Sequence, residues 1–278
     1  MANVEVIEAL RGLDLSSYPY DEVKRLVSLF APKILGIWIP RGQLIERIRP
    51  DAGVFDRKDV SYRPADQNNK PQRATLPGKT AFYGTLNHLE EPTWNTRYVS
   101  LTEVSKLYRK GPLENGKEVY TWSRWVVADK IHLAVIVDDA VFENACHNQL
   151  LEMAKREWIK SRTFTDGPMQ SEEYNSYVVK QFSKMVSSDY DYIISATITD
   201  VLFYASKFDG VMYPPVQAVG DYAMNVAIRP DVTDSKLILT DASEMEYIQE
   251  NRKGNLCFTR HGIPVEKDAR GLKRWKYE

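Results

Sequence analysis

The order of strand-like and helical segments constrains this fold more than any single motif. Strand-like segments lie before, between and after a block of three helical segments, instead of alternating with helices one by one. Regular alternation would indicate a parallel sheet, whereas this order favours a mixed α+β fold. We therefore predict an α+β fold in which helices flank a mixed sheet core and a helical extension occupies the N-terminus.

Apolar spacing and turn residues locate the predicted elements along the chain. Two short helices are expected within residues 1–36, divided by SSYPY. Asp21 is a candidate cap of the second, in which Val23, Leu26, Val27 and Phe30 are spaced to form one apolar face. Further helices are expected over residues 100–111, 139–162, 171–188 and 195–207. Strands are expected over residues 42–50, 80–86, 118–128, 131–137, 210–214, 222–229 and 235–248. Asp129 and Lys130 predict a hairpin-like connection between two of these strands, and a charged tail is expected from about Asn251.

The chain contains no low-complexity linker, so we predict three regions within one body. Residues 1–36 form the helical extension, residues 41–235 form the main domain, and residues 236–278 supply a C-terminal strand and the charged tail. The N-terminal helices have three open roles, which are packing on the core, binding a partner protein and mediating self-association.

Composition excludes several classes of protein. The chain has 278 residues, with 37 Lys and Arg against 38 Asp and Glu, and this balance supports neither a nucleic-acid nor a polybasic membrane partner. Only Cys146 and Cys257 are present, which is too few for a disulfide framework and favours a reducing, cytoplasmic setting. The N-terminus has charges every few residues and no long apolar run, so we expect no signal peptide or membrane span.

Familiar metal and nucleotide motifs are missing. The four histidines are scattered without HExxH or paired-cysteine spacing, so we expect no metal. The chain has no GxGxxG, no GxxxxGK[ST] and no GxSxG. A bound nucleotide would therefore depend on side chains for much of its binding.

Several side chains could supply such a site. Arg47 and Arg49 lie two apart on one strand face, where they could bind a pyrophosphate or could be solvated surface arginines. Arg73 lies in a loop just before the strand that carries Tyr83. Glu103 is expected at the start of a helix, where the dipole favours its carboxylate, although a glutamate is also common there without function.

Taken in order, these segments resemble the RES family, which is named for arginine, glutamate and serine positions. The resemblance begins at LIERIRP and continues through RATLPGKTAFYGTL and TEVSKL. Its most specific part is YIISATITDVLFYASKFDGVMYPPVQAVGDYAMNVAIRPDV, and it covers roughly residues 41–235. The N-terminal helices and the tail lie outside it.

This resemblance implies a fold similar to ADP-ribosyltransferases, with NAD bound in a cleft. Family members of the toxin type degrade NAD by hydrolysis or phosphorolysis of the nicotinamide–ribose bond and are inhibited by an antitoxin. The resemblance thus implies NAD, inorganic phosphate and an antitoxin as partners. It assigns the family arginines to Arg47 or Arg49 and to Arg73, the aromatic position to Tyr83, and the glutamate to Glu103. Asn225 takes the position after the glycine turn.

Two positions depart from the family pattern. Pro215 stands at the family serine, and Thr75 stands at the asparagine that often follows the loop arginine. Gln217 offers an amide that could replace the lost hydroxyl. Pro215 favours nucleotide binding without turnover as an alternative to NAD cleavage. The implied fold leaves open a further alternative, which is transfer of ADP-ribose to a macromolecule.

Overall fold

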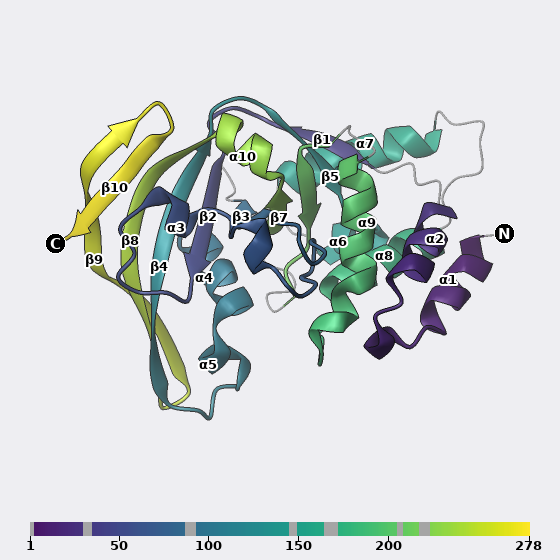
Figure 1. The fold of residues 1–278 in the computed structure, drawn as a ribbon, viewed down its shortest axis with the longest axis horizontal. Helices are drawn as coiled ribbons and strands as arrows, with labels where there is room; N and C mark the ends of the chain where they lie inside the picture. Colours follow the sequence, from purple (N-terminus) through teal and green to yellow (C-terminus); the bar gives the residue numbers. More distant parts are fainter. Residues whose placement is uncertain are drawn as a thin grey trace.

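In the computed structural model, the described residues are 3–29, 35–86, 93–144, 149–163, 172–204, 208–216 and 223–278. Within them, ten strands form a single sheet in the order β1-β5-β6-β7-β3-β2-β4-β8-β10-β9, with an additional β8–β9 pairing. The pairs β5–β6 and β8–β10 are parallel, and the other neighbours are antiparallel. Helices pack around this mixed sheet (Figure 1), which confirms the predicted α+β class.

The strands are β1 (Gly36–Ile39), β2 (Leu44–Arg49), β3 (Phe82–Leu86), β4 (Gly116–Val127), β5 (Ile131–Val135), β6 (Gly210–Tyr213), β7 (Met224–Ile228), β8 (Leu237–Glu250), β9 (Lys253–Asp268) and β10 (Gly271–Tyr277). The helices are α1 (Asn3–Arg11), α2 (Tyr20–Leu29), α3 (Arg57–Val60), α4 (Thr93–Val104), α5 (Lys106–Arg109), α6 (Asp139–Asn144), α7 (Gln149–Thr163), α8 (Glu172–Ser183), α9 (Ile193–Tyr204) and α10 (Pro230–Lys236). Short 3-10 turns cover Leu15–Ser17, Ala65–Gln67 and Asp189–Tyr192.

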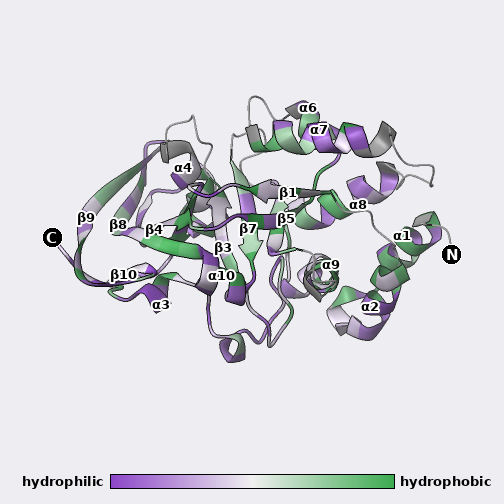
Figure 2. Cartoon of the chain, turned by 90° about the horizontal axis from the view of Figure 1, so that it is seen from above, coloured by the Kyte–Doolittle hydropathy of each residue, from purple (hydrophilic) through white to green (hydrophobic). Residues whose placement is uncertain are grey.

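Both faces of β5 are buried, because helices cover each of them. Along β5, Leu133 and Val135 join one apolar cluster with α6 and α7, whereas Ala134 joins another with α1, α2, α8 and α9. Successive side chains of a strand point to opposite faces, so this alternation separates the two clusters. Figure 2 shows α6 and α7 on one side of β1 and β5, and α2 and α9 on the other.

The N-terminal helices pack on the core. Val23, Leu26 and Val27 are buried on α2, as their spacing predicts. These side chains belong to the cluster that α8 and α9 share, and α2 lies against α9. Core packing is therefore the role that the described residues support, and Phe30 lies outside them.

The prediction of a charged tail after residue 250 is wrong, because this segment forms β9 and β10. Each of these strands pairs with the other and with β8. Leu272 and Trp275 are buried among the charged residues of β10, so the charges belong to the solvent-facing positions of a strand. Gly271 opens β10 at a φ of +84°, and its α-carbon faces the Leu239 carbonyl so closely that a side chain would clash.

The predicted hairpin between β4 and β5 is wrong, and so is the extent of one predicted helix. Strand β4 pairs with β2 and β8, whereas β5 pairs with β1 and β6, so Asp129 and Lys130 join strands that are not neighbours. The helix expected over 100–111 is two helices. Helix α4 already begins at Thr93, and Ser105 starts α5 because its hydroxyl accepts a hydrogen bond from the Tyr108 N–H at 2.9 Å.

Within the ranges that the structure describes, no helix is both long and apolar enough to cross a membrane.

Candidate functional site

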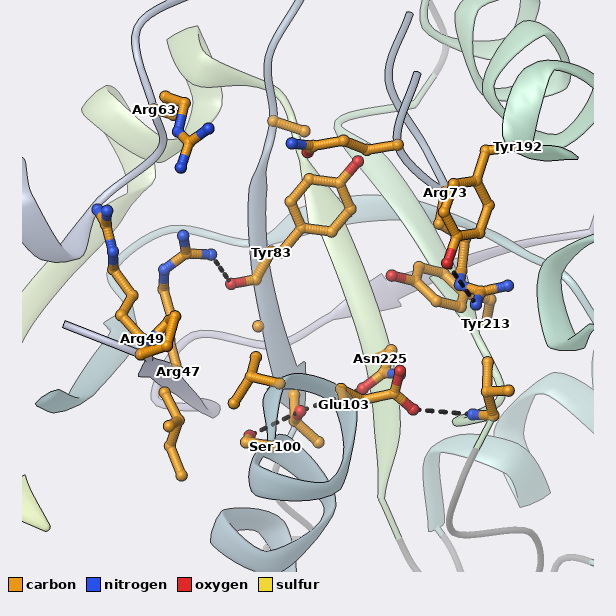
Figure 3. Close-up of a pocket in the computed structure, with 18 of the residues that line it drawn as sticks. Arg47, Arg49, Arg63, Arg73, Tyr83, Ser100, Glu103, Tyr192, Tyr213 and Asn225 are labelled. Atoms are coloured by element: carbon orange, nitrogen blue, oxygen red, sulfur yellow. Dashed lines mark hydrogen bonds between the residues drawn. The ribbon is translucent and has the colours of Figure 1, made fainter. Parts of the chain in front are cut away.

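A cleft of about 700 Å³ opens where β2 and β3 part (Figure 3). The two strands pair only at Ile45 with Leu86 and at Glu46 with Thr85. Beyond this point β2 runs on to Arg49 against β4 alone, while β3 stays paired with β7. The cleft is lined by the end of β2, by β3, by α4 and by the segment between α8 and α9.

A glycine permits the close approach of β2 and β3 at this point. A Cβ atom added at Gly84 would lie 2.6 Å from the Ile45 Cγ2 atom and 3.2 Å from the Glu46 carbonyl oxygen. The first distance is shorter than any normal contact, so a larger residue would push the strands apart. Gly84 itself lines the cleft.

Three arginines, which we call the arginine group, lie together in the lining of the cleft: Arg47, Arg49 and Arg63. Arg47 donates a hydrogen bond to the Tyr83 carbonyl, and burial, followed by the neighbouring Arg49, lowers the pKa of Arg47 to about 9. Arg49 donates to the Asp59 carbonyl and pairs with Asp51 at 3.0 Å. Such a cluster of like charges is stabilised by a bound anion.

Arg73 joins the loop before β3 to the segment that follows α8. Its guanidinium donates to the carbonyl oxygens of Phe182 and Lys184, and lies 4.8 Å from the centre of the Tyr192 ring. It also donates to the Tyr192 hydroxyl at 3.3 Å. These contacts use several of its donors and fix two walls of the cleft relative to each other.

Tyr83 holds the same loop from the other side. Its hydroxyl accepts a hydrogen bond from the Ala74 N–H at 3.1 Å and lies 3.0 Å from the Thr75 Oγ1 atom. Burial raises the pKa of Tyr83 to about 12, which keeps its hydroxyl neutral. Asn68 completes the support, because its amide donates to the Lys79 carbonyl at 2.8 Å.

Glu103 lies in the last turn of α4, so its predicted place at a helix start is wrong. The predicted helix was placed over residues 100–111, whereas α4 begins seven residues earlier, at Thr93, and ends at Val104. The N-terminal dipole therefore gives its carboxylate no support. Instead, its Oε1 atom accepts a hydrogen bond from the Val216 N–H at 2.8 Å, immediately after Pro214 and Pro215.

Asn225 ends a chain of buried polar groups on the floor of the cleft. The Ser100 hydroxyl donates to the Thr85 Oγ1 atom at 2.8 Å, and Thr85 donates to the Asn225 Oδ1 atom at 3.1 Å. Each of the three residues is at most 5% exposed. Asn225 also faces Tyr213 in the β6–β7 pairing, and Tyr213 lines the cleft as well.

The structure thus brings most of the sequence-predicted residues into one cleft, namely Arg47, Arg49, Arg73, Tyr83, Glu103 and Asn225. Gln217 lies outside the described residues. Pro215 is buried and does not line the cleft.

Sequence reasoning missed Arg63, Ser100 and Tyr192 as lining residues. Arg63 lies in a polar loop and has no distinctive spacing. Tyr192 ends a short 3-10 turn and is the first residue of the segment YIISATITD, so a signal was present although Tyr192 was not assigned to the site. Ser100 lies one helical turn before Glu103, which is a signal that could have found it once α4 was placed correctly.

The cleft has different chemistry at its two ends. The arginine group gives one end a positive charge, whereas the Glu103 carboxylate and the Ser100–Thr85–Asn225 chain line the other. Such an arrangement can bind a diphosphate at one end and the hydroxyls of a sugar at the other. In the part of the chain that the structure describes, no cluster of three or more His, Cys, Asp or Glu side chains is arranged to hold a metal.

No protein-family model matches the chain, and no curated protein sequence matches it either. One solved structure, the MbcT–MbcA toxin–antitoxin complex of M. tuberculosis, contains a chain that is 11% identical, with a TM-score of 0.36. The match covers 80% of this chain and 91% of that chain. At this level of similarity it identifies neither a family nor an activity.

Proposed function

We propose that this protein is a RES-like enzyme that binds NAD and cleaves the bond between nicotinamide and ribose. One observation carries the proposal. The residues that the family resemblance selects lie far apart in the sequence, on β2, on β3 and the loop before it, on α4 and on β7, yet they line the same cleft.

The division of charge in the cleft suits this substrate. Arg47 and Arg49 are placed to bind the diphosphate, because guanidinium groups match phosphate oxygens in geometry. The Tyr192 ring, whose centre lies 4.8 Å from the Arg73 guanidinium carbon, offers an apolar surface for a base. Glu103 then lies at the end of the cleft where the ribose next to nicotinamide would bind.

The reaction needs little more than positioning and charge. As the C1′–N bond breaks, its electron pair leaves with nicotinamide, and positive charge develops on the ribose. A nearby carboxylate such as Glu103 stabilises that charge. The oxygen of water or of inorganic phosphate then bonds to C1′, and the proton of the attacking group is released to solvent. A strong protein nucleophile is not required, since nicotinamide is a good leaving group.

The test is nicotinamide release from NAD by the purified protein, with and without inorganic phosphate. We expect release in at least one condition, and a large loss in Glu103→Gln. Glu250→Gln, at an exposed position at the end of β8, is the matched control and should retain full release. Wild-type release no faster than that of Glu103→Gln rejects the proposal. If labelled ADP-ribose instead remains on a macromolecule, the reaction is a transfer.

A second candidate is binding of the dinucleotide without turnover. Pro215 favours it, because proline has neither the hydroxyl of the family serine nor an N–H. Calorimetry that shows NAD binding without nicotinamide release supports this candidate. Restoring the hydroxyl with Pro215→Ser should then raise release, whereas an unchanged rate shows that the proline is not what prevents turnover.

The resemblance to toxin-type family members further suggests that the protein depletes NAD in its host and is inhibited by an antitoxin. Controlled expression in a bacterial host tests this directly. We expect the NAD pool and the growth rate to fall with the wild type and to be preserved with Glu103→Gln. Growth arrest with an intact NAD pool would contradict the proposal.

A further inference from the structure

A second cavity of about 660 Å³ adjoins the cleft. It lies between α3 and the loop that follows it on one side, and the start of β10 on the other. Arg49 and Arg63 line both cavities, so the two spaces meet at the arginine group. A ligand whose diphosphate lies on these arginines would therefore have the second cavity next to it.

The wall of the second cavity is rich in positive charge. Its cationic side chains are Arg49, Arg57, Lys58, Arg63, Arg270 and Lys273, and its carboxylates are Asp56, Asp59 and Asp234. Four of these cations are held in ion pairs: Arg49 with Asp51, Arg57 with Asp268, Arg270 with Asp234, and Lys273 with Glu266.

The two remaining cations, Lys58 and Arg63, are exposed. Neither forms an ion pair with any residue in the described ranges. Both line the second cavity, Lys58 from α3 and Arg63 from the loop that follows α3. Arg63 also lines the cleft, whereas Lys58 does not. Their charges are thus available to an incoming anion.

Buried donors in the same wall also lack partners. The Ser61 Oγ atom and the Arg270 Nε atom have no hydrogen-bond partner among the described residues, and Ser61 is only 6% exposed. An unsatisfied buried donor costs free energy, so a donor in a cavity wall is commonly satisfied by water or a ligand. Both atoms are donors that an anion could accept from.

From these observations we propose that the second cavity is a phosphate subsite, used when the dinucleotide lies in the cleft. The inference rests on the proposed function, and it adds a preference for a phosphate group beyond the diphosphate. Two sources can supply this group, namely a phosphate on the adenosine ribose of the dinucleotide, as in NADP, or free inorganic phosphate.

The experiment measures dissociation constants by calorimetry. Its probes are NAD, NADP, adenosine 5′-phosphate and adenosine 2′,5′-bisphosphate, and NAD is measured again in the presence of inorganic phosphate. The proteins are the wild type, Lys58→Ala and the matched control Lys253→Ala. Lys253 is an exposed lysine at the start of β9, outside both cavities.

We expect the added ribose phosphate to tighten wild-type binding by about tenfold, because charge-assisted hydrogen bonds of this kind are strong. Lys58→Ala should reduce this preference to about threefold or less, whereas Lys253→Ala should keep it. If free phosphate tightens NAD binding in the wild type but not in Lys58→Ala, the subsite takes free phosphate instead. The subsite is overturned if NAD and NADP have equal dissociation constants, if the monophosphate and the bisphosphate of adenosine do as well, and if free phosphate has no effect on NAD binding.

This design separates the two proposals. Cleavage of NAD without any preference for the extra phosphate leaves the proposed function standing and rejects the subsite. A preference for the bisphosphate without nicotinamide release supports the subsite and rejects the cleavage reaction. If none of the four nucleotides binds, both are rejected.

Discussion

The Oε1 atom of Glu103 accepts a hydrogen bond from the backbone N–H of Val216 at 2.8 Å. This contact joins the last turn of α4 to the chain just after Pro214 and Pro215. Glu103 and Val216 both line the cleft, so the carboxylate orders a wall of the site and also supplies a negative charge there. The structural and chemical contributions of Glu103 can be separated by substitution.

Glu103→Gln should abolish most of the nicotinamide release while preserving the fold. The amide oxygen of glutamine still accepts from Val216, but the charge that stabilises the ribose is gone. We expect the rate constant of release to fall by about 100-fold or more, with a similar dissociation constant for NAD. Glu103→Ala should in addition lose about 1 kcal/mol in the free energy of unfolding, since the Val216 N–H loses its partner. A glutamine variant as active as the wild type would exclude a role for the charge.

Arg73→Lys should loosen the cleft although it conserves the charge. A lysine ammonium cannot lie over the Tyr192 ring as the guanidinium does while also donating to the carbonyls of Phe182 and Lys184. We expect the dissociation constant for NAD, measured by calorimetry, to rise by about tenfold. Arg25→Lys, at an exposed ion pair on α2, is the control and should bind NAD normally. Unchanged affinity in Arg73→Lys would show that charge alone is sufficient at this position.

Tyr83→Phe should destabilise the protein in a pH-dependent way. At pH 8 the Ala74 N–H loses its acceptor, and we expect a loss of about 1–2 kcal/mol in the free energy of unfolding. The folded-state pKa of Tyr83 is raised to about 12, above the usual value of 10.0. The stabilisation from this shift is therefore complete below pH 10 and is lost as the pH rises towards 12.

The difference in the free energy of unfolding between wild type and Tyr83→Phe should accordingly shrink over that pH range. Urea unfolding at pH 8, 10 and 11 measures it. Tyr190→Phe, at a partly exposed ring, is the control and should differ from the wild type by less than about 0.5 kcal/mol at pH 8. A gap that widens with pH would contradict the assignment of a buried, neutral Tyr83.

Gly84→Ala should destabilise the junction of β2 and β3. The added methyl group would lie 2.6 Å from the Ile45 Cγ2 atom, so we expect a loss of about 1–3 kcal/mol in the free energy of unfolding. Gly12→Ala is the control, because a Cβ there meets its nearest atoms at 3.6 Å. Chemical denaturation of both variants measures the effect, and equal stability would show that the strands can separate without cost.

The α+β class and most of the elements were predictable from the sequence, because they depend on local patterns. Alternating apolar residues located β2 and β3, and the spacing of Val23, Leu26 and Val27 located the buried face of α2. Local patterns were less informative where buried apolar residues alternate with charged ones. The alternation of β10 escaped notice because its buried Leu272 and Trp275 lie among lysines and arginines.

Strand neighbours and the shape of the site were decided by the tertiary structure. Residues Asp129 and Lys130 resemble a hairpin turn, yet β4 and β5 pair with other strands, since pairing depends on contacts between segments far apart in the chain.

The sequence by itself determined which side chains are available to the cleft, including the arginines and Glu103. Only the tertiary structure decided that Arg63 joins the arginine group and that Glu103 bonds to Val216. The reason is physical, because these relationships depend on the parting of β2 from β3 and on the packing of α4 against both strands, which no local spacing encodes.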